Sequence, residues 1–391
     1  MVVNASRPSR AACSIAAREC SARRSSTSRQ PSHPTSASKR AKAAITARRT
    51  GGRPTAPPSA AGPPAGSSGP SASSAITAPL RTVRIAIPRW PATLPSEAGG
   101  NVQRVPAGEE APVTAETVTF RGDEGLALVA DEWNRDLGDH HPVILLLHGG
   151  GQNRFSWKNT GRILADRGFR VVALDMRGHG DSDRAPDGDY GLDALVRDTA
   201  EVLSQIGRPV VLIGASMGGM TGIATARELG PSAVTKLVLV DVVPRFEHSG
   251  TSRIRDFMSR HIHGFDTLDQ AADAIADYLP HRQHRRNPEG LKKNLRRRDG
   301  RWHWHWDPAF VTSARDDPLL ADELEQAAAD LQIPVLLIRG RMSDVVSHAG
   351  VEAFLATVPH AEFVELSDAG HTAAGDDNDA FTDAVVAFVT R

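Results

Sequence analysis

The sequence predicts an α/β fold: a mostly parallel, doubly wound sheet with an inserted helical cap, preceded by a disordered, basic N-terminal segment. Three observations support this prediction. Short apolar runs alternate with segments of helical periodicity from about residue 114 to residue 391, as in a parallel sheet covered on both faces. This alternation stops between about residues 245 and 331. Residues 1–112 are rich in Ser, Ala, Pro and Arg and have few large apolar residues.

The N-terminal segment also differs from the rest of the chain in charge. Residues 1–110 carry 14 arginines and two lysines against four glutamates, whereas the whole chain has 46 basic and 46 acidic residues. Such a segment buries too little apolar surface to offset its ordering entropy, so we expect residues 1–112 to be disordered. Its composition resembles an organelle transit peptide, and a basic tail can contact nucleic acid. The favoured interpretation is a dispensable extension, or a translation start placed too far upstream. We expect that no nucleic-acid partner is required.

The positions of the cysteines and the lengths of the apolar runs indicate the cellular compartment in which the protein is expected to work. Both cysteines, Cys13 and Cys20, lie in the N-terminal segment, so the rest of the chain has no disulfide, cysteine nucleophile or cysteine-based metal site. No stretch reaches the roughly 18 apolar residues of a membrane span, and no secretory signal follows the early arginines. We therefore expect a cytoplasmic protein without a membrane span. Its oligomeric state stays open.

The ordered part is expected to begin with an antiparallel hairpin, whose strands are residues 116–120 and 126–133. Unbroken apolar runs then predict buried strands, and segments with a period near 3.6 predict the helices between them. The expected strands are 143–147, 169–174, 210–213, 236–243, 333–340 and 361–366. The expected helices are 157–166, 192–206, 221–229, 351–358 and 379–389.

This order divides the chain into a core of residues 113–244, a cap of residues 245–331 and a second part of the core, residues 332–391. The cap contains a basic run that can steer an acidic substrate. We interpret it instead as the solvated side of a helix packed through Leu291 and Leu295.

Residues 302–306 read Trp-His-Trp-His-Trp. Alternate histidines can bind a metal, but Asp307 is the only acidic residue close by and no cysteine is near, so we expect no metal here. Aromatic residues that line an apolar acyl pocket, or that anchor the cap, fit better. Trp304 is therefore a candidate substrate-binding residue.

The central motif is Gly-Ala-Ser-Met-Gly at residues 214–218. It matches the pattern G-x-S-x-G between an apolar strand and a helix, which is the context that a nucleophile elbow requires. Glycines on both sides of Ser216 permit a turn too tight for a Cβ atom. We therefore predict that Ser216 is a catalytic nucleophile at the carboxyl end of the sheet.

A serine nucleophile needs a base and an acid that orients the base. Asp344 and His371 each follow a predicted strand and come after Ser216 in the order Ser, Asp, His, which suits this architecture. Asp241 ends another strand and is the alternative acid, whereas we interpret Asp368 as a turn residue.

The oxyanion that forms during acyl transfer needs two N–H donors. Met217 supplies one by its position directly after the serine. Residues 149–151 are three consecutive glycines after a buried strand, and they expose their backbone to a ligand. Gly150 is the preferred second donor and Gly151 the alternative, and Gly149 and Gly151 are also expected to contact the substrate.

Together, these motifs resemble the α/β-hydrolase fold superfamily, and within it the capped branch of cofactor-free haloperoxidases, esterases and epoxide hydrolases. They are His148-Gly149-Gly150, the run from Asp175 to Ser182, the Ser216 elbow, Asp344 and Gly370-His371. The resemblance covers residues 114–391 and implies that Arg177 to Ser182 form a structural loop beside the site.

Three departures from that branch narrow the expected chemistry. Epoxide hydrolases and dehalogenases of the branch use an aspartate nucleophile, whereas this chain has Ser216. Tyr278 is the one tyrosine in the cap, so the pair of tyrosines that polarises an epoxide is missing. The lipases with a similar triple glycine usually have an acidic residue where this chain has Ala215.

We therefore expect a cofactor-free serine hydrolase that cleaves a carboxylic ester or a related small acyl substrate. The alternatives are a C–C hydrolase or a perhydrolase of the same fold, and a ligand-binding receptor with low turnover.

Removal of residues 1–112 should change neither the thermal stability nor the esterase activity by much, because this segment has few large apolar residues with which to pack against the core. The comparison uses melting temperature and ester turnover of the full and shortened chains. Loss of soluble, folded protein after truncation would contradict the expectation.

Overall fold

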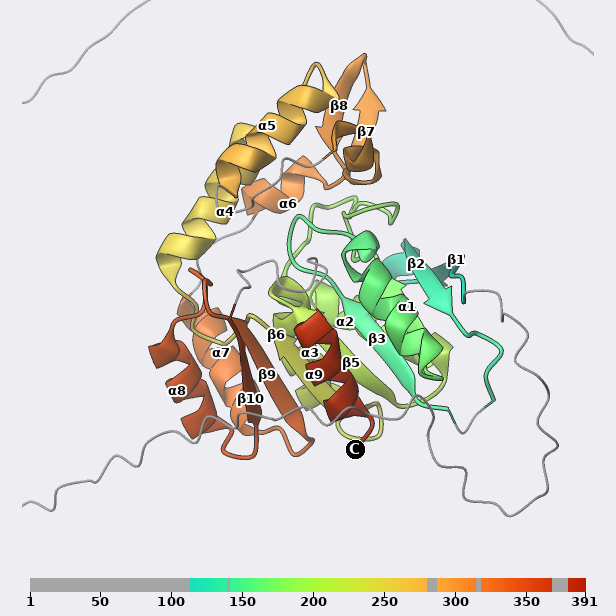
Figure 1. Cartoon of the computed structure of the whole chain (residues 1–391), viewed down its shortest axis with the longest axis vertical. Helices are drawn as coiled ribbons and strands as arrows, with labels where there is room; N and C mark the ends of the chain where they lie inside the picture. Colours follow the sequence, from blue (N-terminus) through green and yellow to red (C-terminus); the bar gives the residue numbers. More distant parts are fainter. Residues whose placement is uncertain (1–112, 139–140, 280–286, 314–317, 368–378) are drawn as a thin grey trace, which may run out of the picture. The chain divides into compact units, whose positions relative to one another are not determined.

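An eight-stranded sheet forms the centre of the described part of the chain (Figure 1). The computed structural model describes residues 113–391 except 139–140, 280–286, 314–317 and 368–378, and all the described residues belong to one compact unit. Residues 1–112 and His371, the candidate base, lie outside the described residues.

The sheet has the strand order β1-β2-β4-β3-β5-β6-β9-β10. β2 pairs antiparallel with both β1 and β4, and the remaining pairs are parallel. The predicted hairpin and the predicted mostly parallel sheet are therefore confirmed. The strands are β1 Glu116–Arg121, β2 Ala127–Trp133, β3 Val143–Leu147, β4 Arg170–Leu174, β5 Val210–Ala215, β6 Val234–Val240, β9 Val335–Gly340 and β10 Glu362–Leu366.

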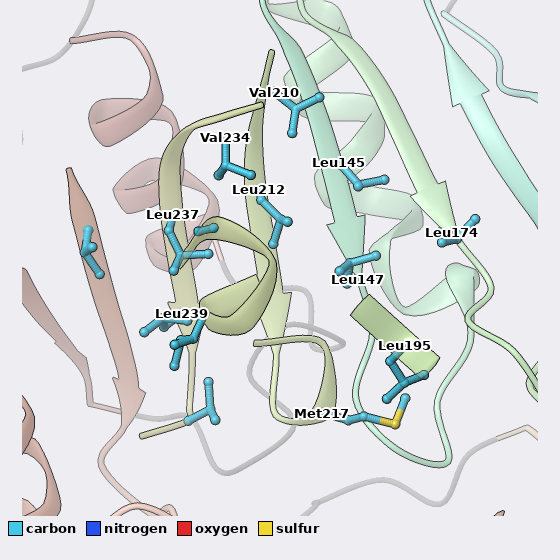
Figure 2. Packing of buried hydrophobic residues seen from close by; sticks show 14 of the residues in the cluster. Leu145, Leu147, Leu174, Leu195, Val210, Leu212, Met217, Val234, Leu237 and Leu239 are labelled. Atoms are coloured by element: carbon cyan, nitrogen blue, oxygen red, sulfur yellow. The ribbon is translucent and has the colours of Figure 1, made fainter. Parts of the chain in front are cut away.

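Helices cover both faces of the sheet, because the central strands are apolar on both sides. In β3, Leu145 and Leu147 face one core cluster, whereas Ile144 and Leu146 face the other. The first cluster lies against α2, α3 and α8, and Figure 2 shows part of it around β5 and β6. The second lies against α1 and α9. The helices are α1 Lys158–Asp166, α2 Leu192–Ile206, α3 Met217–Leu229, α8 His348–Thr357 and α9 Asp379–Val389.

The segment between β6 and β9 forms a hydrophobic cluster of its own, which includes Met258, Phe265, Leu291, Leu295 and Trp304. It contains helices, as predicted, but also a two-stranded sheet. Its elements are α4 His248–Arg260, α5 Leu268–Tyr278, the 3-10 helix η3 Pro288–Asn294, β7 Leu295–Arg298, β8 Arg301–Trp304, α6 Pro308–Ser313 and α7 Pro318–Ala329.

The prediction of a basic helix through Leu291 and Leu295 is wrong. Both residues are buried as expected, but Leu291 lies in η3 and Leu295 begins β7. Between β7 and β8, Asp299 and Gly300 both have positive φ, 49° and 79°, as in a tight hairpin turn. In β7, Leu295 is buried and the two arginines that end the strand, Arg297 and Arg298, are exposed.

α7 packs differently from the rest of this segment. Its residues Leu324, Ala327 and Ala328 belong to the hydrophobic core of the sheet, and the helix contacts α3 and α8. The boundary at residue 331 stays a prediction. Within the described ranges, no helix combines the length and the hydrophobicity that crossing a bilayer requires.

Candidate active site

Ser216 occupies a strained turn between β5 and α3. Its backbone has φ 46° and ψ −114°, an unfavourable region for a residue with a side chain, and such strain gathers at functional sites. A Cβ atom at Gly218 would overlap the carbonyl oxygen of Leu147, and Gly214 is equally restricted by the backbone of Gly218. The turn therefore has the tight geometry predicted for an elbow.

The glycine loop after β3 lies directly against this turn. A Cβ atom on Gly149 would be 3.3 Å from the Cβ of Ser216, and the Gly218 N–H donates to the carbonyl of His148 at 3.2 Å. Within the described part of the chain, the N–H groups of Gly150 and Met217 have no hydrogen-bond partner. These are the two groups expected to hold an oxyanion.

A cavity of about 990 Å³ opens above the turn, at the upper end of the range for small-molecule sites. Ser216, Met217 and all three glycines of the loop line it. Trp304 and Trp306 line it from the segment between β6 and β9, with their rings stacked at a centroid distance of 4.8 Å. The serine and the candidate substrate-binding residues therefore share one cavity.

Two aspartates lie beyond the ends of the neighbouring strands β6 and β9, and their surroundings differ. Asp344 has a side chain that is 37% exposed, and its Oδ2 pairs with Nη2 of Arg253 in α4 at 2.8 Å. Asp241 is fully buried and has φ 51°. Its carboxylate accepts hydrogen bonds from Ser343 Oγ at 2.6 Å and from the Gly340 N–H at 3.3 Å.

Three buried histidines surround the glycine loop: His148, His179 and His305. His305, which follows β8, has no catalytic or binding role predicted from the sequence. Each ring accepts a hydrogen bond from a backbone N–H. The accepting nitrogen therefore carries no proton, and the ring is the neutral imidazole. The donors are Met176 to His148 at 3.0 Å, Gly151 to His179 at 3.1 Å and Gly180 to His305 at 2.8 Å.

Burial keeps these rings uncharged. It lowers the pKa of His148 to about 4. Burial and repulsion from His148 lower the pKa of His179 to about 3. Burial also lowers the pKa of His305 well below its usual value, with further repulsion from His179, His148 and Arg296. Asp175 and Asp307 act weakly in the opposite direction on His179.

A buried ionic cluster, which sequence analysis missed, supports the loop of residues 177–182. Arg154 is 5% exposed. It donates from Nε to Asp131 at 2.9 Å and from Nη1 to Asp181 at 2.8 Å, and it also pairs with the fully buried Asp175. The Asp181 N–H in turn donates to Asp175 at 2.9 Å. This cluster agrees with the structural role expected for the loop.

Comparisons with known proteins place the chain in a family. The model of the alpha/beta hydrolase fold family matches residues 142–377. Esterase Rv0045c of Mycobacterium tuberculosis is 29% identical over 247 residues, which cover 61% of this chain and 80% of that protein. Its crystal structure superposes with a TM-score of 0.54 at 26% identity, covering 72% of this chain and 93% of the other.

A second relative is the sn-1-specific diacylglycerol lipase of Mus musculus, 28% identical over 264 residues, or 63% of this chain and 81% of the lipase. The chain belongs to the alpha/beta hydrolase fold family. It is an enzyme, an esterase-like hydrolase of that fold.

The buried histidines predict that the protein loses stability in mild acid. Their pKa values are lower in the folded state than the ordinary value near 6.5, so the unfolded chain binds more protons below that pH. The free energy of unfolding is then at its full value above about pH 6.5. As the pH decreases below this value, each ring lowers the free energy of unfolding by about 1.4 kcal/mol per pH unit. Urea unfolding at pH 7, 6 and 5 measures this, and His305→Asn should flatten the slope. Constant stability from pH 7 to pH 5 would contradict the expectation.

Proposed function

We propose that this protein is a serine esterase that cleaves a carboxylic ester or a related small acyl compound without a cofactor. The observation that carries the proposal is the strained Ser216 in a large cavity, beside two N–H groups that have no partner among the described residues. The ester chemistry is supported by the relatives, which are named esterase and lipase.

In the proposed mechanism, Ser216 Oγ attacks the carbonyl carbon of the ester while His371 accepts the hydroxyl proton. The N–H groups of Gly150 and Met217 stabilise the negative charge that develops on the carbonyl oxygen. Collapse of this intermediate expels the alcohol, which receives the proton from His371. A water molecule, activated by the same histidine, then hydrolyses the acyl-enzyme and regenerates Ser216.

Asp344 is the proposed acid that orients His371 and stabilises its charged form. It follows β9, the strand next to β10 in the sheet, and the chain reaches residue 371 after β10. Asp344 also pairs with Arg253 on α4, so the negative charge of its carboxylate is partly balanced by that guanidinium. Asp241 is the alternative, since its backbone is strained and its carboxylate is buried.

The substrate is proposed to bind its acyl part between the glycine loop and the aromatic wall. Gly149, Gly151 and Trp304 are the proposed contacts, and residues 245–331 act as the cap over the site. The cavity volume of about 990 Å³ suits an acyl group larger than acetate. We place the reaction in the cytoplasm, as the cysteine content suggests.

Replacement of the nucleophile tests this function directly. Ser216→Ala should abolish turnover of short p-nitrophenyl esters and labelling by a fluorophosphonate, with the melting temperature retained. Ser156→Ala is the matched control, because Ser156 also lines the cavity and should be dispensable. Labelling of any residue other than Ser216 would refute the assignment. Absence of wild-type turnover, together with thermal stabilisation by esters, would indicate a receptor instead.

A second set of variants identifies the acid. Asp344→Asn should lower the turnover number by about 10²–10⁴-fold, the upper end being the loss measured in another serine hydrolase. Asp241→Asn should cost less than about 10-fold, since asparagine tolerates positive φ and retains an acceptor for Ser343.

Arg253→Gln is the control for this set, because it breaks the same ion pair while leaving the carboxylate in place. All variants are compared at matched folded fraction. If Asp241→Asn is the severely impaired variant, or if Arg253→Gln reproduces the full loss of Asp344→Asn, the assignment of Asp344 is wrong.

A further inference from the structure

The side chain of Phe310 connects the segment between β6 and β9 to the glycine loop of residues 149–151. It lies in α6, lines the cavity, and packs against the hydrophobic clusters of both the sheet and this segment. A Cβ atom on Gly150 would be 3.1 Å from Cζ of Phe310, which is closer than an ordinary contact between carbon atoms. The phenyl ring therefore lies directly against the residue that supplies one of the two proposed oxyanion donors.

Two aromatic residues of the core hold this ring in place. The ring of His179 lies at a centroid distance of 4.6 Å from it with an interplanar angle of 73°, and the ring of Tyr190 at 5.9 Å with an angle of 88°. Both are edge-to-face arrangements, which aromatic pairs prefer. His179 also accepts the hydrogen bond of the Gly151 N–H at 3.1 Å, so the phenyl ring and the glycine loop share one support.

Asp307 fixes the start of α6 and, with it, the backbone of Phe310. The Asp307 N–H donates to the carbonyl of Gly178 at 2.8 Å, and its Oδ2 accepts from the Tyr190 hydroxyl at 2.6 Å. The Asp307 carbonyl accepts from the Phe310 N–H at 3.0 Å, and its Oδ1 accepts from the Ala309 N–H at 3.0 Å. Phe310 is thus held through its ring and through its backbone, and it moves aside only if these contacts break.

The place of Phe310 along the sheet indicates which part of an ester it meets. Ser216 follows β5, and the strand order puts β3 and β4 on one side of β5 and β6, β9 and β10 on the other. The ring contacts Gly150 and His179, which follow β3 and β4. In the proposed mechanism, the alcohol receives its proton from His371, which follows β10 in the sequence. The alcohol then extends toward β10, and the acyl group extends toward β3 and β4, beside Phe310.

The α-carbon is the part of the acyl chain that this ring restricts. It is bonded to the carbonyl carbon, whose oxygen lies at the Gly150 N–H in the transition state. The α-carbon is therefore held within a few bond lengths of Gly150 and of the ring that packs on it. Closely packed side chains tolerate added methyl groups poorly, because the packing leaves few alternative positions. A linear chain presents only hydrogens to the ring at this carbon, whereas a branched chain presents a methyl group.

We propose that Phe310 is a specificity-determining residue: it limits the width of the acyl group at the α-carbon, so that the enzyme prefers acyl groups that are unbranched there. This inference rests on the proposed esterase function, and it narrows the substrate class to esters of acids that are linear next to the carboxyl group. It also gives the segment between β6 and β9 a defined part in substrate selection.

The test compares two p-nitrophenyl esters of the same composition, the pentanoate and the 2,2-dimethylpropanoate, whose acyl groups differ only in branching. The ratio of their kcat/KM values, measured on one preparation, is independent of the folded fraction because both values scale with the active enzyme. The wild type should prefer the pentanoate by at least about 10-fold beyond the ratio of the alkaline hydrolysis rates, which is the discrimination that a methyl group causes in an apolar pocket.

Phe310→Ala should reduce this preference by about 10-fold or more, and Phe310→Leu, which keeps part of the apolar volume, should reduce it by less. The leucine variant decides the question if the alanine variant does not fold. Phe257→Ala is the matched control, because Phe257 also lines the cavity but stacks its ring on Tyr278 at a centroid distance of 4.4 Å. This control should keep the wild-type preference.

A second pair of esters checks the assignment to the acyl side. The preference for n-butyl over sec-butyl butanoate, which differ in the alcohol, should be the same in Phe310→Ala as in the wild type. A change in this alcohol preference in place of the acyl preference would overturn the inference.

Two further results would overturn the inference alone, in a wild type that is active and labelled at Ser216. One is a wild-type preference no larger than the chemical reactivities of the two acyl esters explain. The other is an equal acyl preference in the Phe310 variants and in Phe257→Ala. An inactive, unlabelled wild type would instead overturn the proposed function.

Discussion

The carboxyl edge of the sheet depends on one close approach, that between the turn at Ser216 and the end of β3. Gly218 packs against the carbonyl of Leu147, and its N–H donates to His148. This contact sets the separation between the start of α3 and the glycine loop, and therefore between the N–H groups of Met217 and Gly150. A side chain at residue 218 would push the two strands' ends apart. The strained backbone of Ser216 is compatible with folding because the packed strands on both sides hold it.

Much of the fold could be predicted because a buried parallel strand requires an unbroken apolar run. The run Val143–Leu147 matches β3, and the helical periodicity of Leu192–Ile206 and Asp379–Val389 matches α2 and α9. The hairpin β7–β8 was not predicted because residues 296–298 are three consecutive arginines, which give no apolar alternation in the sequence. Asp299-Gly300 was the available signal, since this dipeptide favours the tight hairpin turn that the structure contains.

In the candidate site, too, some residues could be predicted from the sequence and others could not. Ser216 was predictable because a strand, a sharp turn and a helix follow one another locally in the sequence. The support of the site was not, because its hydrogen bonds join distant residues: Gly151 and His179 are 28 positions apart, and Gly180 and His305 are 125. Likewise, nothing in the sequence near Arg154 indicates that Asp131, Asp175 and Asp181 surround it.

The packing of α7 separates two tasks of the long connection between β6 and β9. These strands are parallel neighbours, so the chain must return along the sheet between them, usually in a right-handed crossover. α7 makes that return: its core residues pack under the sheet, while Leu320, Ala321 and Leu324 near its start line the cavity. The part from α4 to α6 is thus an excursion that leaves and rejoins the same edge. Its length and sequence can change without altering the handedness of the fold, so the walls of the cavity that come from this part can vary while the sheet stays the same.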